Sequence, residues 1–195
     1  MLTDMLPLLD DKALPPADPA WRTRPWYRRV LWPFFKLLVA LAILWGVLSA
    51  RADVKVGDAF PALAAAEVSG ALPATQGQVV FVDFWASWCA PCKASFPAYA
   101  RIYADYAPKG LVMVAVSVDD SASAYAGFLR KTSPPFPTVR DQHQTLVRQV
   151  RVPTMPTSYL IGRDGRVRYV HTGYHGAQTE REVRSEIDTL LAEKS

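Results

Sequence analysis

The stretch VVFVDFWASWCAPCK, residues 79–93, decides the fold and contains the only two cysteines of the chain, Cys89 and Cys92. Its first seven residues are apolar β-formers apart from one aspartate, which predicts a strand buried on both faces. The alanine- and tyrosine-rich residues that follow the cysteines predict a helix. The two thiols are therefore expected at a strand-to-helix junction.

This position suits thiol chemistry. A cysteine in the first turn of a helix faces unpaired backbone N–H groups and the positive end of the helix dipole, and both favour the thiolate over the thiol. Cys92 follows Cys89 by three residues, so the two sulfurs can close a small disulfide loop. The sequence predicts a pair that exchanges a disulfide rather than one that keeps it.

Metal and haem sites fit the pattern poorly. His171 and His175 form an H-x3-H pair, but they lie far beyond the spacing of a zinc finger, and His171 lies in a strand pattern. Covalent haem attachment needs a histidine after the second cysteine, where Lys93 stands. We expect no metal, and no cofactor apart from the cysteine pair itself.

The charge of the chain points to no nucleic-acid partner. The formal net charge is +4, and arginines of residues 22–29 together with Lys36 account for much of the excess. No basic cluster stands out in the remainder, as a nucleic-acid-binding face would require. With 195 residues, half of them hydrophobic, the chain has room for one domain and an N-terminal extension.

The N-terminal extension has two parts. Residues 1–29 lack periodicity and predict a disordered cytoplasmic tail. Residues 30–50 follow, and 31–50 are apolar apart from Lys36 and Ser49, long enough to form a transmembrane anchor. Because the arginines precede this segment, the positive-inside rule places the domain, residues 51–195, outside the cytoplasm.

Two alternatives for the extension stay open. Residues 37–48 have the length of a signal-peptide core, and the A-x-A pattern at 50–52 would allow cleavage after Ala52, leaving a soluble domain. Translation could also start further downstream. Each version exports residues 53–195, so the expected location is periplasmic, with the anchor in the inner membrane unless it is cleaved.

From residue 57 onward the pattern predicts an α/β sandwich with helices on both faces of a mixed sheet, in the order strand–helix–strand–helix–helix–strand–strand–helix. One apolar helix precedes it. A short hairpin is expected from 60–63 and 68–72, and a capping box at 179–182 is expected to begin the last helix. The helix after the cysteines is expected to bury Phe96, Ala100, Tyr103 and Ala107. The expected strands are 79–85, 111–118, 157–161 and 166–171, and the expected helices are 89–107, 121–132, 142–150 and 179–191.

Residues 57–193 resemble the thioredoxin superfamily, specifically its exported TlpA/ResA-like thiol–disulfide oxidoreductases. The stretch FVDFWASWCAPCK, residues 81–93, is similar to the active-site signature of that family, and VPTMPTSYLI, residues 152–161, is similar to its second signature. The segment 111–119 and the helix after it resemble the insertion of the TlpA-like branch. The resemblance implies a thioredoxin-like three-layer sandwich with a cis peptide before Pro156.

The resemblance also implies roles for individual residues. Cys89 would be the attacking thiolate and Cys92 the resolving thiol. Pro156 in cis would leave the backbone of Met155 free to pair with an incoming polypeptide. Trp88 would shape the surface around the sulfurs, or simply pack there.

Asp83 is the acidic residue of the buried strand, so burial should raise its pKa toward neutrality. That suits a base that takes the proton from Cys92, although a partly solvated carboxylate at the strand end is the alternative. Many TlpA-like proteins carry glutamate three residues after the second cysteine, where this chain has Ser95. The combination of Asp83 and Ser95 resembles thioredoxin itself.

The function that we expect is reduction of disulfides in exported proteins, with electrons from a membrane donor of the DsbD type. Cytochrome c maturation is the best-known task of relatives, and residues 168–173 have some likeness to members devoted to it. A dithiol oxidase is the second hypothesis, but the Ala90-Pro91 dipeptide supplies no cation to stabilise a thiolate strongly. A non-catalytic binding module on the same scaffold is a further hypothesis, but such a module would need neither thiol. Peroxidase activity is less expected, because the sequence pattern of peroxiredoxins is absent.

Overall fold

The computed structural model describes residues 34–40 and 53–193. Residues 34–40 are helical, and residues 52–195 form a compact unit of their own. Within the described residues, no helix has both the length and the apolarity needed to cross a bilayer. The predicted tail at 1–29, most of the apolar segment 30–50 and the cleavage pattern at 50–52 lie outside the described residues and stay predictions.

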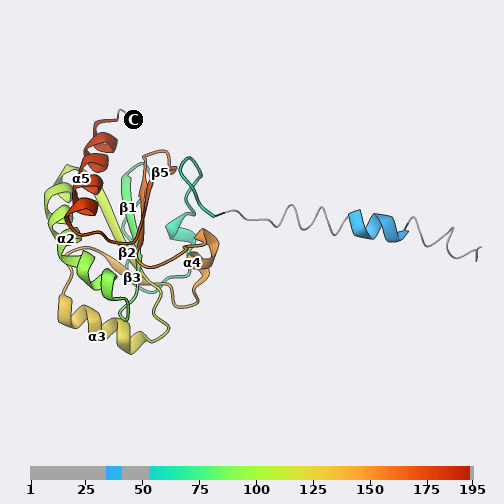
Figure 1. The fold of residues 1–195 in the computed structure, drawn as a ribbon, viewed down its shortest axis with the longest axis horizontal. Coiled ribbons are helices and arrows are strands. Elements are labelled where there is room, and N and C mark those ends of the chain that lie inside the picture. The colour runs from blue at the N-terminus through green and yellow to red at the C-terminus, as the bar shows by residue number, and fades with distance from the viewer. Residues whose placement is uncertain (1–33, 41–52, 194–195) are drawn as a thin grey trace, which may run out of the picture. The chain divides into compact units, whose positions relative to one another are not determined.

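A mixed five-stranded sheet forms the centre of the compact unit (Figure 1), with the strand order β3-β2-β1-β4-β5. β1 pairs in parallel with β2, and β2 with β3, whereas β4 runs antiparallel to both β1 and β5. The strands are β1 (Val79–Trp85), β2 (Leu111–Ser117), β3 (Thr138–Arg140), β4 (Thr157–Ile161) and β5 (Val167–Thr172).

Helices cover both faces of this sheet, as predicted. Figure 1 shows α2 and α5 on one side of the sheet and α4 on the other. The Ser121 hydroxyl accepts the Ala124 N–H and caps the start of α3. The helices are α2 (Ala90–Tyr106), α3 (Ala122–Thr132), α4 (Thr145–Val150) and α5 (Ala177–Ala192), with 3-10 turns at Leu63–Ala65 and Ala107–Lys109.

β1 is buried along its whole length, as its composition predicts. Alternation along the strand sends Phe81, Asp83 and Trp85 toward α2. The Phe81 ring lies 5.0 Å from that of Tyr99, and the Trp85 ring lies 4.8 Å from that of Phe96. The aromatic contacts therefore fix which face of the sheet carries the aspartate.

Two expectations about the sheet and its surroundings were incomplete or wrong. The strand β3 was not predicted, because its three residues follow a proline-rich loop and carry little β signal. The hairpin of 60–63 with 68–72 does not form. Instead, Ala59 pairs with Arg166 and Ser69 with Arg140, so this segment bridges to two different parts of the domain.

The helix predictions also need two corrections. The last helix begins at Ala177, after Gly176 with φ 64°, rather than at the predicted capping box. The Thr179 hydroxyl lies inside the helix and accepts the His175 N–H. In α2, Phe96 is buried as predicted, but Ala100, Tyr103 and Ala107 are only partly buried. Tyr99, Ile102 and Tyr106 are buried instead, each one position before an expected residue.

Candidate active site

The two cysteines lie where β1 runs into α2. Cys89 is the N-cap residue of α2, and Pro91 lies in the first turn. A disulfide joins Cys89 to Cys92, with their Cα atoms 5.3 Å apart. Cys89 is 5% exposed and Cys92 is fully buried, so the first cysteine is the more accessible of the two.

The cap places a backbone donor on the first sulfur. The Cys92 N–H donates a hydrogen bond of 3.2 Å to Sγ of Cys89. This is one of the N–H groups that a helix leaves unpaired at its start. In the reduced protein the same donor and the helix dipole act on a Cys89 thiolate, which they stabilise.

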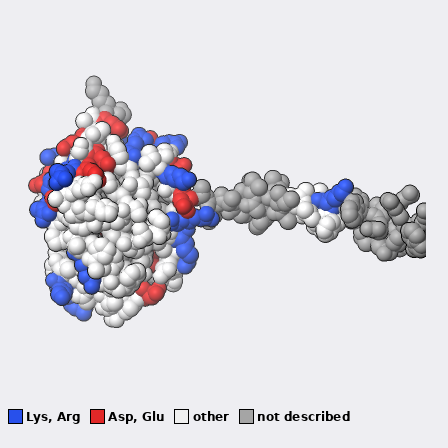
Figure 2. Space-filling view, viewed as in Figure 1, with Lys and Arg blue, Asp and Glu red and all other residues white. Residues whose placement is uncertain are grey.

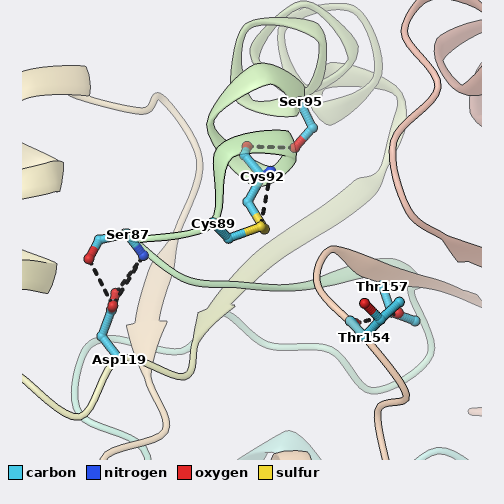
Figure 3. Close-up of a disulfide and its surroundings, with 7 residues drawn as sticks. All are labelled: Ser87, Cys89, Cys92, Ser95, Asp119, Thr154 and Thr157. Carbon is cyan, nitrogen blue, oxygen red and sulfur yellow. Dashed lines mark hydrogen bonds between the residues drawn. A yellow bond between two sulfur atoms is a disulfide. The ribbon is translucent and has the colours of Figure 1, made fainter.

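The loop between β1 and the cysteines is fixed by Asp119, a residue that the sequence analysis did not single out. Figure 3 shows Ser87 and Asp119 pointing toward each other beside the first turn of α2. The Asp119 carboxylate is buried and follows β2, the neighbour of β1. The sequence does contain a signal for this contact: Asp119 directly follows the apolar stretch 111–118.

Asp83 lies on the same face as the disulfide and is 1% exposed. Burial raises the pKa of its carboxyl well above 3.8. Neither of its oxygens has a hydrogen-bond partner among the described residues. The carboxyl is therefore buried and its pKa is raised, as the sequence predicted. It does not reach solvent at a strand end.

The predicted loop before β4 has a cis peptide bond between Met155 and Pro156. Pro156 is buried and its carbonyl accepts the Gly173 N–H at 2.8 Å, which ties the loop to the end of β5. Figure 3 shows Thr154 and Thr157 of this loop on the side of the disulfide away from Ser87, and the Thr157 hydroxyl donates to the Thr154 carbonyl. Met155 is half-buried.

The two tryptophans of the signature differ sharply. Trp85 is fully buried and packs against Phe96 and Phe128, so it belongs to the core. Trp88, next to Cys89, is 69% exposed, more than any other large hydrophobic side chain among residues 53–193. Its ring is available to a macromolecule that approaches the disulfide.

The histidines are not arranged around a metal. Nε2 of His171 lies 2.6 Å from a carboxylate oxygen of Glu186, an ion pair between β5 and α5 if the ring is protonated. In the described ranges, no three side chains of the types that bind metals come together. The face shown in Figure 2 carries charges of both signs around its rim, without one broad basic area.

A cysteine pair at the N-cap of a helix, next to a cis-proline loop on a mixed sheet, is the arrangement of thioredoxin-fold oxidoreductases. The AhpC/TSA family matches residues 56–170, and the chain belongs to that family. The ResA thiol–disulfide oxidoreductase of Oceanobacillus iheyensis is 29% identical over 148 residues, which cover 70% of this chain and 77% of that protein.

Two further relatives agree. ResA of Bacillus subtilis is 37% identical over 98 residues, 50% of this chain and 55% of its own length. The crystal structure of a candidate DsbE thiol:disulfide interchange protein from Chlorobium tepidum superposes with a TM-score of 0.63 at 32% identity. It covers 72% of this chain and 100% of that chain. The chain is accordingly a thiol–disulfide oxidoreductase of the ResA/DsbE type.

Proposed function

We propose that the compact unit is an exported reductase of protein disulfides. The observation that carries this proposal is the position of Cys89 at the N-cap of α2, with uncharged Ala90 and Pro91 between it and Cys92. The thiolate gains the helix dipole and one N–H donor, but no cation within the pair. Moderate stabilisation of the thiolate keeps the dithiol a good electron donor, because strong stabilisation of the reduced form makes an oxidant.

The reaction takes two exchange steps. The Cys89 thiolate attacks one sulfur of the client disulfide, forms a mixed disulfide and expels the other client sulfur as a thiolate. Sγ of Cys92 then attacks Sγ of Cys89, expels the second client sulfur and closes the disulfide. Two electrons pass to the client, and the two cysteines are oxidised.

Asp83 supplies the base for the second step. The Cys92 thiol is buried and must lose its proton as it attacks, and Asp83 lies under α2 on the same face of β1. Its raised pKa allows it to accept that proton near neutral pH, because a base works best when its pKa approaches the working pH.

The client lies between Trp88 and the loop of Met155 and Pro156. The backbone of Met155 takes part in no hydrogen bond within the described part of the chain, so its N–H and carbonyl can pair with an extended polypeptide. Trp88 supplies an exposed apolar surface on the other side of the sulfur.

Export follows from the arginines that precede the apolar segment 31–50. A reductase outside the cytoplasm needs electrons from within, so we propose a membrane donor of the DsbD type as its partner. Disulfide-containing exported proteins are the clients, and oxidised apocytochrome c is the class that the resemblance favours.

Trapping of clients tests this function. A Cys92→Ala variant, expressed as the full chain, should accumulate mixed disulfides between Cys89 and exported proteins, because the second step is blocked. A Cys89→Ala variant is the matched control and should trap nothing. Equal recovery from both variants, or only cytoplasmic proteins from Cys92→Ala, would contradict the proposal.

A further inference from the structure

Asp83 belongs to a cluster of buried polar groups, and the two-cysteine mechanism assigns no role to the other members. Ser158 is its direct partner across the β1–β4 ladder, and Tyr99 projects from α2 onto the same face. Asp83, Ser158 and Tyr99 are each 1% exposed, and Ser95 is fully buried. Directly opposed residues on adjacent strands have Cβ atoms about 5 Å apart, so the two side chains are next to each other on one face of the sheet.

The pKa of the Tyr99 hydroxyl responds to each of the other three groups. Burial raises the pKa of Tyr99 well above 10.0, and the negative charge of Asp83 raises it further, whereas Ser158 and Ser95 lower it. No hydrogen bond of ordinary geometry joins the Tyr99 hydroxyl to any described residue, and the same holds for both oxygens of Asp83. A buried donor and a buried acceptor thus lie on the same face of the sheet without being paired.

Unpaired buried polar groups are costly, and a catalytic or redox role is one explanation for their presence in a native protein. A protonated Asp83 can be buried at a low cost in free energy, whereas an ionised Asp83 needs hydrogen-bond donors around its carboxylate. The Ser95 hydroxyl is already used, because it donates to the Cys92 carbonyl at 2.8 Å. Tyr99 and Ser158 are the donors that remain in the cluster.

We propose that the hydroxyls of Tyr99 and Ser158 donate hydrogen bonds to the Asp83 carboxylate when it is ionised. They act as positioning residues for the base that takes the proton from Cys92, and the inference rests on the proposed role of Asp83. In the step itself, the proton moves from Cys92 Sγ to Asp83, and the two hydroxyls keep their own protons.

Few other titratable groups face this cluster. From α2 there are Cys92 and Tyr99, and the Tyr174 ring lies 6.2 Å from that of Tyr99. Next along the same face, His171 of β5 pairs with Ser158, but its ring is engaged by Glu186. Ala115 is the partner of Asp83 on β2. The high pKa of Tyr99 keeps its hydroxyl a donor throughout the working range of pH.

The test measures the second thiol step alone. Stopped-flow reaction of the reduced protein with Ellman's reagent releases one thionitrobenzoate when Cys89 attacks and a second when Cys92 attacks. The rate of the second release is followed against pH for the wild type, Tyr99→Phe, Ser158→Ala and Asp83→Asn. Tyr159→Phe is the matched control, because Tyr159 is a buried tyrosine beside Ser158 that faces the opposite side of the sheet.

Loss of a donor destabilises the carboxylate, so the pH midpoint of the second release should rise in Tyr99→Phe and Ser158→Ala. A hydrogen bond to a charged group corresponds to a rise on the order of one pH unit, or about tenfold slower release below the midpoint. The first release and the Tyr159→Phe profile should match the wild type. Ser158→Ala keeps the test valid if Tyr99→Phe folds poorly.

Two results separate the possible failures. If Asp83→Asn keeps the wild-type pH profile, Asp83 is not the base and the proposed role of that residue fails. If Asp83→Asn loses the profile while Tyr99→Phe and Ser158→Ala keep the wild-type midpoint, this inference alone is overturned.

Discussion

Both oxygens of the Asp119 carboxylate accept the Ser87 N–H, at 3.1 and 3.0 Å, and one of them also accepts the Ser87 hydroxyl at 2.8 Å. The Ser117 hydroxyl donates to the carboxylate from β2, also at 2.8 Å. Ser87 precedes Cys89 by two residues. The approach of the chain to the redox pair is therefore fixed by a carboxylate that follows the neighbouring strand β2.

Replacement of Asp119 by alanine should destabilise the domain and loosen this loop. Hydrogen bonds to a charged group contribute about 1.5–3 kcal/mol each, and they share one carboxylate here, so we expect a loss of about 3 kcal/mol. Asp120→Ala, at the exposed next residue, is the control and should cost less than about 1 kcal/mol. Urea unfolding of the oxidised proteins measures both, and equal losses would argue against the anchoring role.

Cys89 should have the lower thiol pKa of the pair. Its sulfur accepts a backbone N–H at the start of α2, whereas Cys92 is fully buried. We expect a value for Cys89 within the range of about 3.5–7.5 that activated cysteines show. The rate of alkylation by iodoacetamide against pH gives this value, with Cys92→Ala used to isolate Cys89. A midpoint above that of free cysteine would contradict the proposed mechanism.

The reduction potential should be low. With no charge between the cysteines, we expect a value nearer that of thioredoxin, about −270 mV, than that of the oxidant DsbA, about −120 mV. Equilibration in dithiothreitol buffers, followed by tryptophan fluorescence, determines it. A potential above about −150 mV would favour the oxidase instead.

Asp83 should make the stability of the oxidised protein depend on pH. Because burial raises its folded-state pKa above 3.8, the folded state holds a proton that the unfolded state has lost between these two values. The stabilisation is complete below pH 3.8 and is lost as pH rises toward the raised pKa. The slope is at most about −1.4 kcal/mol per pH unit.

Asp83→Asn should remove this slope, and Asp120→Asn, at an exposed aspartate, should keep it. Urea unfolding between about pH 4 and pH 8 compares the three proteins, and contributions common to all of them cancel in the differences. Parallel curves for the wild type and Asp83→Asn would show that the folded state does not retain the proton.

The domain should be exported. Alkaline phosphatase fused after Ser195 is expected to be active, because the arginines before the apolar segment hold the N-terminus in the cytoplasm. A β-galactosidase fusion at the same site is the control and should be inactive. The reverse pair of results would contradict the proposed topology.

The central features could be predicted from sequence because they are local. Seven residues rich in valine and aromatic side chains specify β1, and the helix start at Cys89 follows from the two residues next to it. An aspartate in an otherwise apolar strand predicts either a buried carboxyl with a raised pKa or a solvated carboxyl at the strand end. The structure shows that Asp83 is buried.

Features that depend on pairing between distant segments could not be predicted in this way. Three residues form β3 only because β2 offers an edge, and Ser69 pairs with Arg140, which is far along the chain. The proximity of Tyr99 and Ser158 to Asp83 likewise depends on the register of β4 and the rotation of α2. The sequence pattern predicted buried positions in α2 that are one residue away from the observed ones.

Because β1 is the central strand, the edge strands of the sheet can separate locally without displacing the residues that β1 holds in place. β1 is hydrogen-bonded to β2 on one side and to β4 on the other, whereas β3 and β5 each have one neighbour. Amide protons of such a strand exchange with deuterium mainly through global unfolding, while edge strands exchange through smaller openings. Since Asp83 lies on β1 and the loop to Cys89 leaves its end, a molecule with a frayed β3 or β5 still holds the cysteine pair and the Asp83 carboxyl in register.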